Sequence, residues 1–214
     1  MTIFICGDST AASYKPEQAP LTGWGQAMAD MLPNIPVVNA AMAGRSSKSF
    51  LSEGRLIPVE ERLQPGDLML IQFTHNDWSD LTWRHTDPYT SFVNNLSIFV
   101  ETARLAEAVP VLLTPICLRS FVDGVLQPAH GAYPEAIRTL ARSRGVPLID
   151  LYAMSFRAIS DMGDEASRRL YMNVAPGEYP AYPDGQQDDV HTRYEGAALY
   201  ARMVADALRA LKLI

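Results

Sequence analysis

Three residues far apart in the chain have the side chains that nucleophilic acyl transfer requires. Ser9 follows an apolar run near the start of the chain, and His191 lies near its end. A serine hydroxyl becomes an effective nucleophile when a base removes its proton and a third group orients that base. Asp188 precedes His191 by three residues and is spaced to bond the far nitrogen of the imidazole. These residues predict a Ser-His-Asp triad, with Ser9 as nucleophile and His191 as base.

Acyl transfer also needs hydrogen-bond donors aimed at the oxyanion that develops on the carbonyl oxygen. The candidates are the backbone N–H groups of Ser9 and Gly44 and the side-chain amide of Asn76. A glycine at position 44 lets the backbone approach a ligand without a Cβ in the way. The structural alternative is that all three are turn residues, since Ser, Gly and Asn are common in turns.

Neighbouring polar residues leave one assignment open and suggest two structural roles. Asp189 adjoins Asp188 and is the alternative partner of His191. Asp8 is interpreted as a structural residue that hydrogen-bonds the loop around Ser9. His75 is interpreted as a loop-packing residue rather than a second base.

Five short apolar runs, rich in Val, Ile and Leu, must position these side chains. They lack polar alternation, as is typical of strands covered on both faces. The runs lie at residues 2–6, 35–39, 67–73, 109–114 and 146–150. Amphipathic segments between them predict helices at residues 23–32, 48–63, 88–108, 133–144, 151–170 and 194–211. In the last helix, Leu199, Met203, Ala207 and Leu208 are expected on one face.

Strands that alternate with helices predict an α/β fold, with a parallel sheet between two helical layers. No linker or repeat divides residues 1–214, so a single domain is expected. Segments 116–131 and 173–190 are long, irregular and rich in Pro and Gly. In such sheets the ligand site lies beyond the carboxyl ends of the strands, and three of the polar clusters follow predicted strands. We therefore expect the clusters to meet in one cleft.

Composition argues against several other classes of protein. The formal charge is -6 and no Lys/Arg run is present, so the basic stripe typical of nucleic-acid binding is missing. No apolar run approaches the roughly 20 residues of a membrane-spanning helix. Cys6 and Cys117 have no partner at metal-ligand or redox spacing and are expected to be buried and reduced. We expect a cytoplasmic protein that needs no metal or organic cofactor.

The polar clusters, in their order along the chain, resemble the signature blocks of the GDSL/SGNH hydrolase superfamily. Gly7-Asp8-Ser9 resembles the nucleophile block, Gly44 the second, Asn76-Asp77 the third and Asp188-x-x-His191 the last. The resemblance spans almost the whole chain. It implies a flavodoxin-like three-layer α/β/α sandwich with a five-stranded parallel sheet, the SGNH hydrolase fold, and a serine esterase activity.

Further sequence motifs resemble those of the rhamnogalacturonan acetylesterases within this superfamily. They include Gly23-Trp24-Gly25, Ala43-Gly44-Arg45-Ser46-Ser47, His75-Asn76-Asp77 and Glu195-Gly196-Ala197. The resemblance implies removal of acetyl groups from pectic oligosaccharides. One departure is Thr74, which stands where the third block usually has glycine.

Aromatic and polar residues on the loops near the predicted cleft are candidates for sugar contacts. They are Arg45, Trp78, Trp83 and Tyr182, with His85, Arg119 and Tyr179 also considered.

Two alternative functions remain open at this stage. One is an SGNH esterase for other acyl substrates, such as acetylated xylo-oligosaccharides, small esters or thioesters. The other is a carbohydrate-binding protein without turnover. An α/β-hydrolase is disfavoured, because no G-x-S-x-G elbow occurs and the nucleophile follows the first strand.

Overall fold

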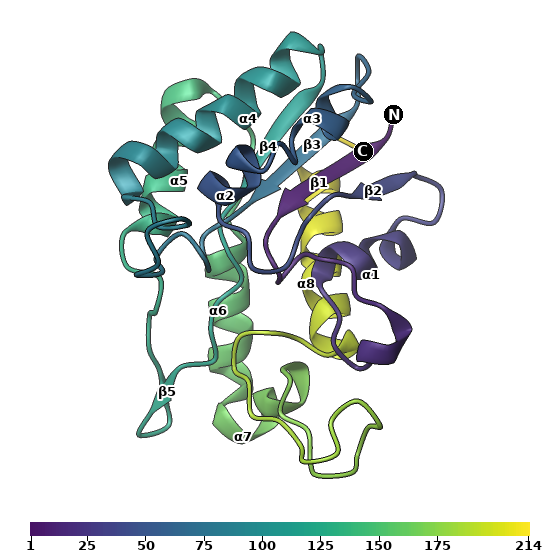
Figure 1. Cartoon of the computed structure of the whole chain (residues 1–214), viewed down its shortest axis with the longest axis vertical. Coiled ribbons are helices and arrows are strands. Elements are labelled where there is room, and N and C mark those ends of the chain that lie inside the picture. Colours follow the sequence, from purple (N-terminus) through teal and green to yellow (C-terminus); the bar gives the residue numbers. More distant parts are fainter.

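The five apolar runs form one parallel sheet in a computed structural model that describes residues 1–214 (Figure 1). The strand order is β2-β1-β3-β4-β7, which is the flavodoxin-like order. β1 is central, and Ile3 pairs with Val37 on one side and with Leu68 on the other. The strands are β1 (Ile3–Gly7), β2 (Val37–Asn39), β3 (Leu68–Gln72), β4 (Val109–Leu113) and β7 (Leu148–Ile149). The predicted fold class is confirmed.

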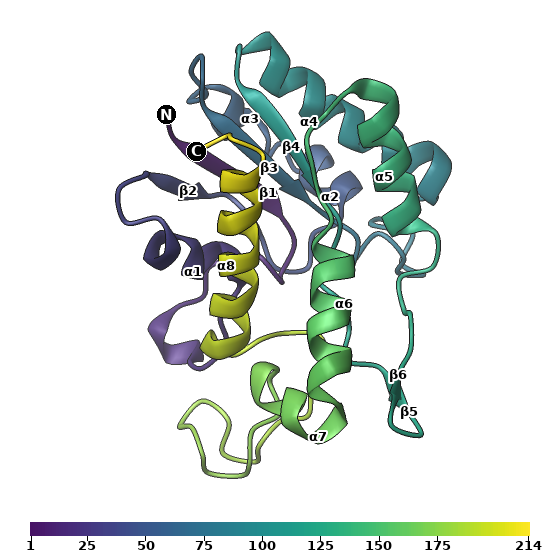
Figure 2. The same cartoon turned by 180° about the vertical axis from the view of Figure 1, so that it is seen from behind.

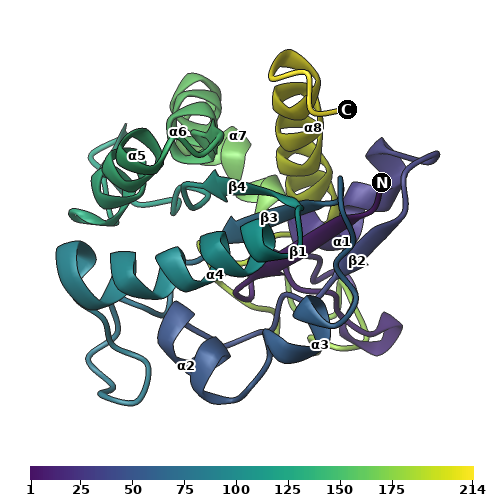
Figure 3. The same cartoon turned by 90° about the horizontal axis from the view of Figure 1, so that it is seen from above.

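Helices cover both faces of the sheet, and Figure 3 shows α8 and α4 on opposite sides of it. One core lies under α1 (Trp24–Met31), α6 (Leu151–Met162) and α8 (Tyr194–Ala210). The other lies under α2 (Ser47–Ser52), α3 (Ile57–Glu60), α4 (Val93–Leu105) and α5 (Tyr133–Arg144). Every residue of β1 and β3 is buried, because each strand is covered from both sides.

Two predicted helices are interrupted in the structure. Residues 48–63 divide into α2 and α3, and residues 151–170 divide into α6, α7 (Asp164–Ser167) and a 3-10 turn (Arg168–Leu170). A glycine with positive φ lies at each break, Gly54 at 68° and Gly163 at 77°. Such a conformation ends a helix. The segment predicted at 88–108 starts with a π-helical turn (Pro88–Phe92) before α4.

The segment predicted to be irregular at 116–131 contains a short hairpin. Strands β5 (Phe121–Val122) and β6 (Val125–Leu126) pair antiparallel across Asp123 and Gly124. Both turn residues have positive φ, 50° and 75°, as a two-residue hairpin turn with an Asp-Gly sequence requires. In Figure 1 this hairpin, α7 and the loop before α8 project from one end of the molecule, away from both termini.

Helix α8 packs beside α1, as Figure 2 shows from behind. Its buried face is rotated from the predicted one: Leu208 is fully buried, whereas Leu199, Met203 and Ala207 pack at the edge of the core. The deeply buried face consists of Ala197, Tyr200, Ala201, Val204, Ala205 and Leu208. No helix is both long and apolar enough to span a bilayer. Cys6 and Cys117 are buried free thiols.

Candidate active site

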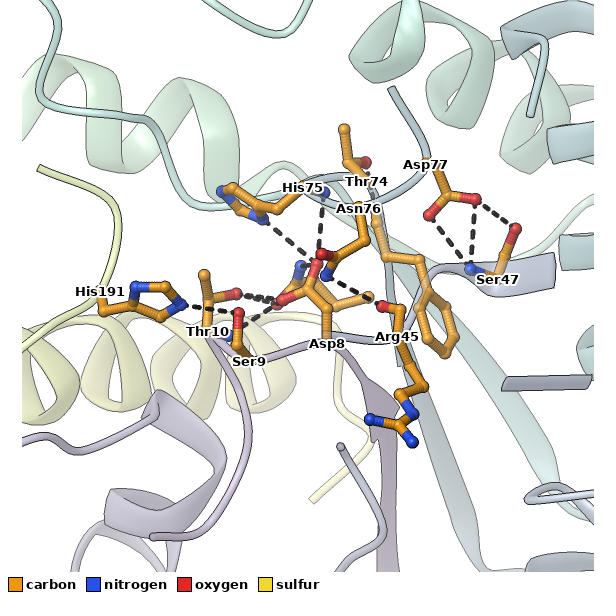
Figure 4. A network of polar contacts seen from close by, with 12 residues as sticks. Asp8, Ser9, Thr10, Arg45, Ser47, Thr74, His75, Asn76, Asp77 and His191 are labelled. Carbon is orange, nitrogen blue, oxygen red and sulfur yellow. Dashed lines mark hydrogen bonds and ion pairs between the residues drawn. The ribbon is translucent and has the colours of Figure 1, made fainter. Parts of the chain in front are cut away.

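The polar clusters meet at the carboxyl edge of the sheet, as their positions after the strands predict. Ser9 lies in the turn after β1, and Asn76 lies in the loop after β3. Gly44 follows β2, and His191 lies just before α8. Figure 4 shows His191 pointing toward Ser9, with Asn76 on the other side of the Asp8 carboxylate.

The Ser9, His191 and Asp188 side chains form a hydrogen-bonded line. Nε2 of His191 lies 2.9 Å from Oγ of Ser9, and Nδ1 lies 2.7 Å from Oδ2 of Asp188. Oδ1 of Asp188 accepts hydrogen bonds from the backbone N–H groups of Val190 (2.8 Å) and His191 (2.9 Å). These bonds fix the carboxylate in place. The line matches the geometry of a nucleophile, a base and an orienting acid.

Asp189 points away from His191 and has its own partners. Its Oδ1 accepts from Nη1 of Arg119 (2.9 Å) and from Nδ2 of Asn173 (2.8 Å). Arg119 is buried and also pairs with Asp164, so its guanidinium anchors the loop before α8. The geometry therefore favours Asp188 over Asp189 as the partner of the base. It also places Arg119 in an anchoring position rather than in one open to sugar.

The electrostatics of this line favour a charged His191. Burial acts to lower the pKa of His191, but the hydrogen bond and charge of Asp188, with a contribution from Asp8, raise it overall. Burial acts to raise the pKa of Asp188, but its bonds from His191 and Val190 lower it overall. The pair thus stabilises the imidazolium that would form when His191 takes the serine proton.

Three N–H donors near Ser9 are available for an oxyanion. The backbone N–H groups of Ser9 and Gly44 make no hydrogen bond within the chain. Gly44 has a φ of 77°, and a Cβ built on it would meet no atom within 4 Å, so the space before it is open. Asn76 donates one hydrogen bond to the carbonyl of Arg45 (3.1 Å), which leaves its second amide hydrogen unused.

The orientation of the Asn76 amide follows from its two neighbours. Oδ1 accepts from Nη1 of Arg84 at 2.9 Å, and arginine can only donate. Nδ2 faces the Arg45 carbonyl, which can only accept. The amide therefore cannot be reversed without losing both bonds. The role of Arg84 in orienting Asn76 was not predicted from the sequence, because Arg84 belongs to no motif. The only sequence signal for this role was its position in the same loop as Asn76.

Asp8 joins the turn of Ser9 to the loop of Asn76. It is fully buried and accepts from the Thr10 hydroxyl (2.7 Å), the Thr10 N–H (3.0 Å) and Nδ1 of His75 (3.2 Å). Burial acts to raise the pKa of Asp8, but the charge and hydrogen bond of His75 and the bonds from Thr10 lower it overall. His75 packs against the ring of His130, with 4.8 Å between centroids. Asp8 and His75 thus occupy structural positions.

Asp77 joins the Asn76 loop to the start of α2 (Figure 4). Its carboxylate accepts from the Ser47 hydroxyl (2.5 Å), the Ser47 N–H (3.1 Å) and the Thr86 hydroxyl (3.0 Å). Burial raises the pKa of Asp77 to about 7. Thr74 lacks a positive φ, so its backbone conformation does not require a glycine, and its carbonyl accepts the Asp77 N–H at 2.9 Å.

The candidate sugar contacts lie in different environments. Arg45 pairs with Glu53 at 3.0 Å. Trp78 and Trp83 are 44% and 49% exposed, so their rings are open to a ligand. Tyr182 donates to the Gln18 carbonyl at 3.1 Å. Burial and the charge of Asp188 raise the pKa of the Tyr182 phenol.

One further tyrosine near the triad was not anticipated from the sequence. The hydroxyl of Tyr14 donates to the carbonyl of Ser9 at 2.7 Å and steadies the nucleophile turn. No group of three or more His, Cys, Asp or Glu side chains is arranged to hold a metal ion.

An α/β/α sandwich with a serine, imidazole and carboxylate line at its sheet edge is the architecture of a GDSL-type hydrolase. The chain matches the GDSL-like Lipase/Acylhydrolase family over residues 5–199, so it belongs to this family and is an esterase. It is 39% identical over 213 residues to the rhamnogalacturonan acetylesterase RhgT of Bacillus subtilis, covering 99% of this chain and 90% of that protein. The probable rhamnogalacturonan acetylesterase YesY of the same organism is 33% identical, with 99% and 94% covered.

Solved structures agree with the sequence relatives. The protein YxiM of Bacillus subtilis has a TM-score of 0.83 at 25% identity, covering 99% of this chain and 56% of that chain. The acetylxylan esterase Axe2 of Geobacillus stearothermophilus has a TM-score of 0.69 at 15% identity, with 97% and 93% covered, and so shares the fold. The resemblance drawn from the sequence blocks is confirmed.

Proposed function

We propose that this esterase removes O-acetyl groups from pectic, rhamnogalacturonan-type oligosaccharides by a Ser-His-Asp mechanism. The observation that carries the mechanism is the line of 2.9 Å and 2.7 Å contacts from Ser9 through His191 to Asp188. The substrate class is supported by two relatives of at least 33% identity whose names specify this polysaccharide. The exposed indoles of Trp78 and Trp83 provide flat faces for sugar rings.

The proposed reaction has two steps. Nε2 of His191 accepts the Ser9 proton as Oγ attacks the acetyl carbonyl carbon. The oxyanion then accepts hydrogen bonds from the Ser9 and Gly44 N–H groups and from the Asn76 amide. Protonated His191 gives its proton to the departing sugar oxygen, which leaves an acetyl-serine. Water deprotonated by His191 attacks this ester, and acetate leaves as Ser9 regains its proton.

The deciding experiment is acetate release by the wild type and Ser9→Ala from three kinds of substrate. These are acetylated rhamnogalacturonan oligomers, acetylated xylan oligomers and 4-nitrophenyl acetate. We expect serine-dependent release with a clear preference for the rhamnogalacturonan oligomers. Preference for the xylan oligomers or the simple ester would contradict the substrate class, and absence of serine-dependent turnover would contradict the mechanism.

Asn76→Ala is expected to lower kcat by about 10²- to 10³-fold with little change in KM, because the lost donor acts on charge present only in the transition state. Steady-state kinetics with 4-nitrophenyl acetate would measure both constants. Asn94→Ala, an exposed asparagine on α4, is the matched control and should leave both unchanged. A rise in KM with kcat intact would show that Asn76 binds substrate rather than the oxyanion.

The pH dependence of kcat/KM should follow the neutral fraction of His191. A base must be unprotonated to accept the serine proton, and the net pKa of His191 is raised by Asp188 and Asp8 against the effect of burial. The activity should therefore rise with pH through a midpoint above about 6.5, the ordinary histidine value. A profile from pH 5 to 9, compared with an NMR titration of His191, would measure it. A midpoint below the ordinary value would contradict this assignment.

A further inference from the structure

Arg84 is unusual among the arginines of this chain. It is partly buried and forms no ion pair with any carboxylate. Every other arginine either pairs with an acidic side chain or is exposed to solvent. Charges withdrawn from water are normally paired, because their lost hydration must be replaced. Arg84, which is partly buried, has no carboxylate partner within the chain.

The surroundings of Arg84 place this charge beside the proposed acyl site. Its Nη1 donates to Oδ1 of Asn76 at 2.9 Å, and this is its only side-chain hydrogen bond. Its Cζ lies 5.4 Å from the ring centroid of Trp83. Its Nε is buried without a partner, so the guanidinium is held by the loop and not by a second protein acceptor. Because Nε is buried, the donors that remain for a bidentate anion are the unused N–H groups of Nη1 and Nη2.

We propose that Arg84 is a specificity residue that binds the carboxylate of a uronic acid unit next to, or bearing, the acetyl ester. The proposal rests on the proposed carbohydrate acetylesterase function and adds the group that selects an acidic sugar. A planar guanidinium matches a carboxylate through two parallel N–H bonds. Trp83, against which Arg84 stacks, is 49% exposed and offers its face to the same sugar.

The competing role for Arg84 is to orient Asn76 alone. In that case the charge would affect every ester equally, because the oxyanion is the same for each substrate. Carboxylate binding instead affects only substrates that carry the negative charge. The ratio of kcat/KM between an acidic oligomer and its neutral counterpart therefore separates the two roles.

The test uses acetylated rhamnogalacturonan oligomers and the same oligomers methyl-esterified at their uronic acid carboxyl groups, with acetate as the measured product. We expect the wild type to prefer the acidic form by about ten- to a hundredfold, mainly through KM, as a hydrogen-bonded charge pair allows. In Arg84→Gln this ratio should fall close to one. In Arg84→Lys, which keeps the charge but loses the planar fork, part of the preference should return.

Arg157→Gln on α6 removes an exposed charge and should keep the wild-type ratio. Equal losses on both substrates in Arg84→Gln, or an unchanged ratio, would overturn the proposal. Calorimetric binding of deacetylated rhamnogalacturonan oligomers provides a readout that needs no turnover, with weaker binding expected in Arg84→Gln. Absence of acetate release from both oligomers by the wild type would instead count against the proposed function.

Discussion

Ser9→Ala is expected to lower kcat for acetyl ester hydrolysis by about 10⁴- to 10⁶-fold. The hydroxyl of Ser9 lies 2.9 Å from Nε2 of His191, so the substitution removes the nucleophile and leaves the base without its partner. Hydrolysis would then require direct attack by water, without the acetyl-serine step. The residual rate would come from the N–H donors and from substrate binding, which remain in place.

Acetate release by purified Ser9→Ala, measured against the wild type at saturating substrate, tests this expectation. Ser160→Ala, an exposed serine on α6, is the matched control and should keep full activity. Ser9→Ala removes one oxygen from a side chain that packs no core, so we expect the two variants to show equal thermal unfolding. Equal unfolding would exclude a folding defect as the cause of lost activity. Mass spectrometry should find an acetyl group on Ser9 of the wild type after rapid quenching. Retained turnover in Ser9→Ala would contradict the mechanism.

The sheet was predictable because its strands are buried on both faces. A parallel strand between two helical layers must be apolar at every position, and the residues of β1 and β3 meet this condition. The runs therefore stand out from the sequence without any knowledge of their partners. The strand order could be predicted only from the resemblance to the GDSL/SGNH hydrolase superfamily, because pairing between strands depends on contacts between residues that are distant in sequence.

Helix interruptions and the hairpin were harder to predict for local reasons. Hydrophobic periodicity continues across Gly54 and Gly163, so it does not show where the backbone turns into a positive φ. The hairpin did have a local signal, since Asp123-Gly124 between apolar residues favours a two-residue turn. Its strands are only two residues each, which is too short for a period to appear.

Side-chain partners set the limit of prediction at the site. The spacing of Asp188 and Asp189 could not separate the two acids, because their roles depend on which way each side chain points. In the structure Arg119 and Asn173 hold Asp189, which leaves Asp188 against His191. Arg84 was not predictable from spacing, because its contact with Asn76 depends on how the loop after β3 closes on itself.

Asp188→Asn is expected to lower kcat by about 10⁴-fold, the size seen when a triad acid loses its charge but keeps its shape. Nδ1 of His191 donates to Oδ2 of Asp188 at 2.7 Å, and an asparagine amide there can reverse the tautomer of the ring. The substitution also removes the charge that raises the pKa of His191. The residual activity should therefore appear at lower pH than in the wild type.

Asp189→Asn provides the matched comparison, because it neutralises the adjacent carboxylate. The substitution weakens the contact between Nη1 of Arg119 and Oδ1 of residue 189, which are 2.9 Å apart. It therefore loosens the loop before α8 without changing the contacts of the His191 imidazole. We expect a loss of about tenfold or less and no shift of the pH midpoint. Steady-state kinetics of both variants from pH 5 to 9 would measure these effects. Collapse of activity in Asp189→Asn, with a mild effect in Asp188→Asn, would reverse the assignment, since only the acid that orients His191 controls both its tautomer and its pKa.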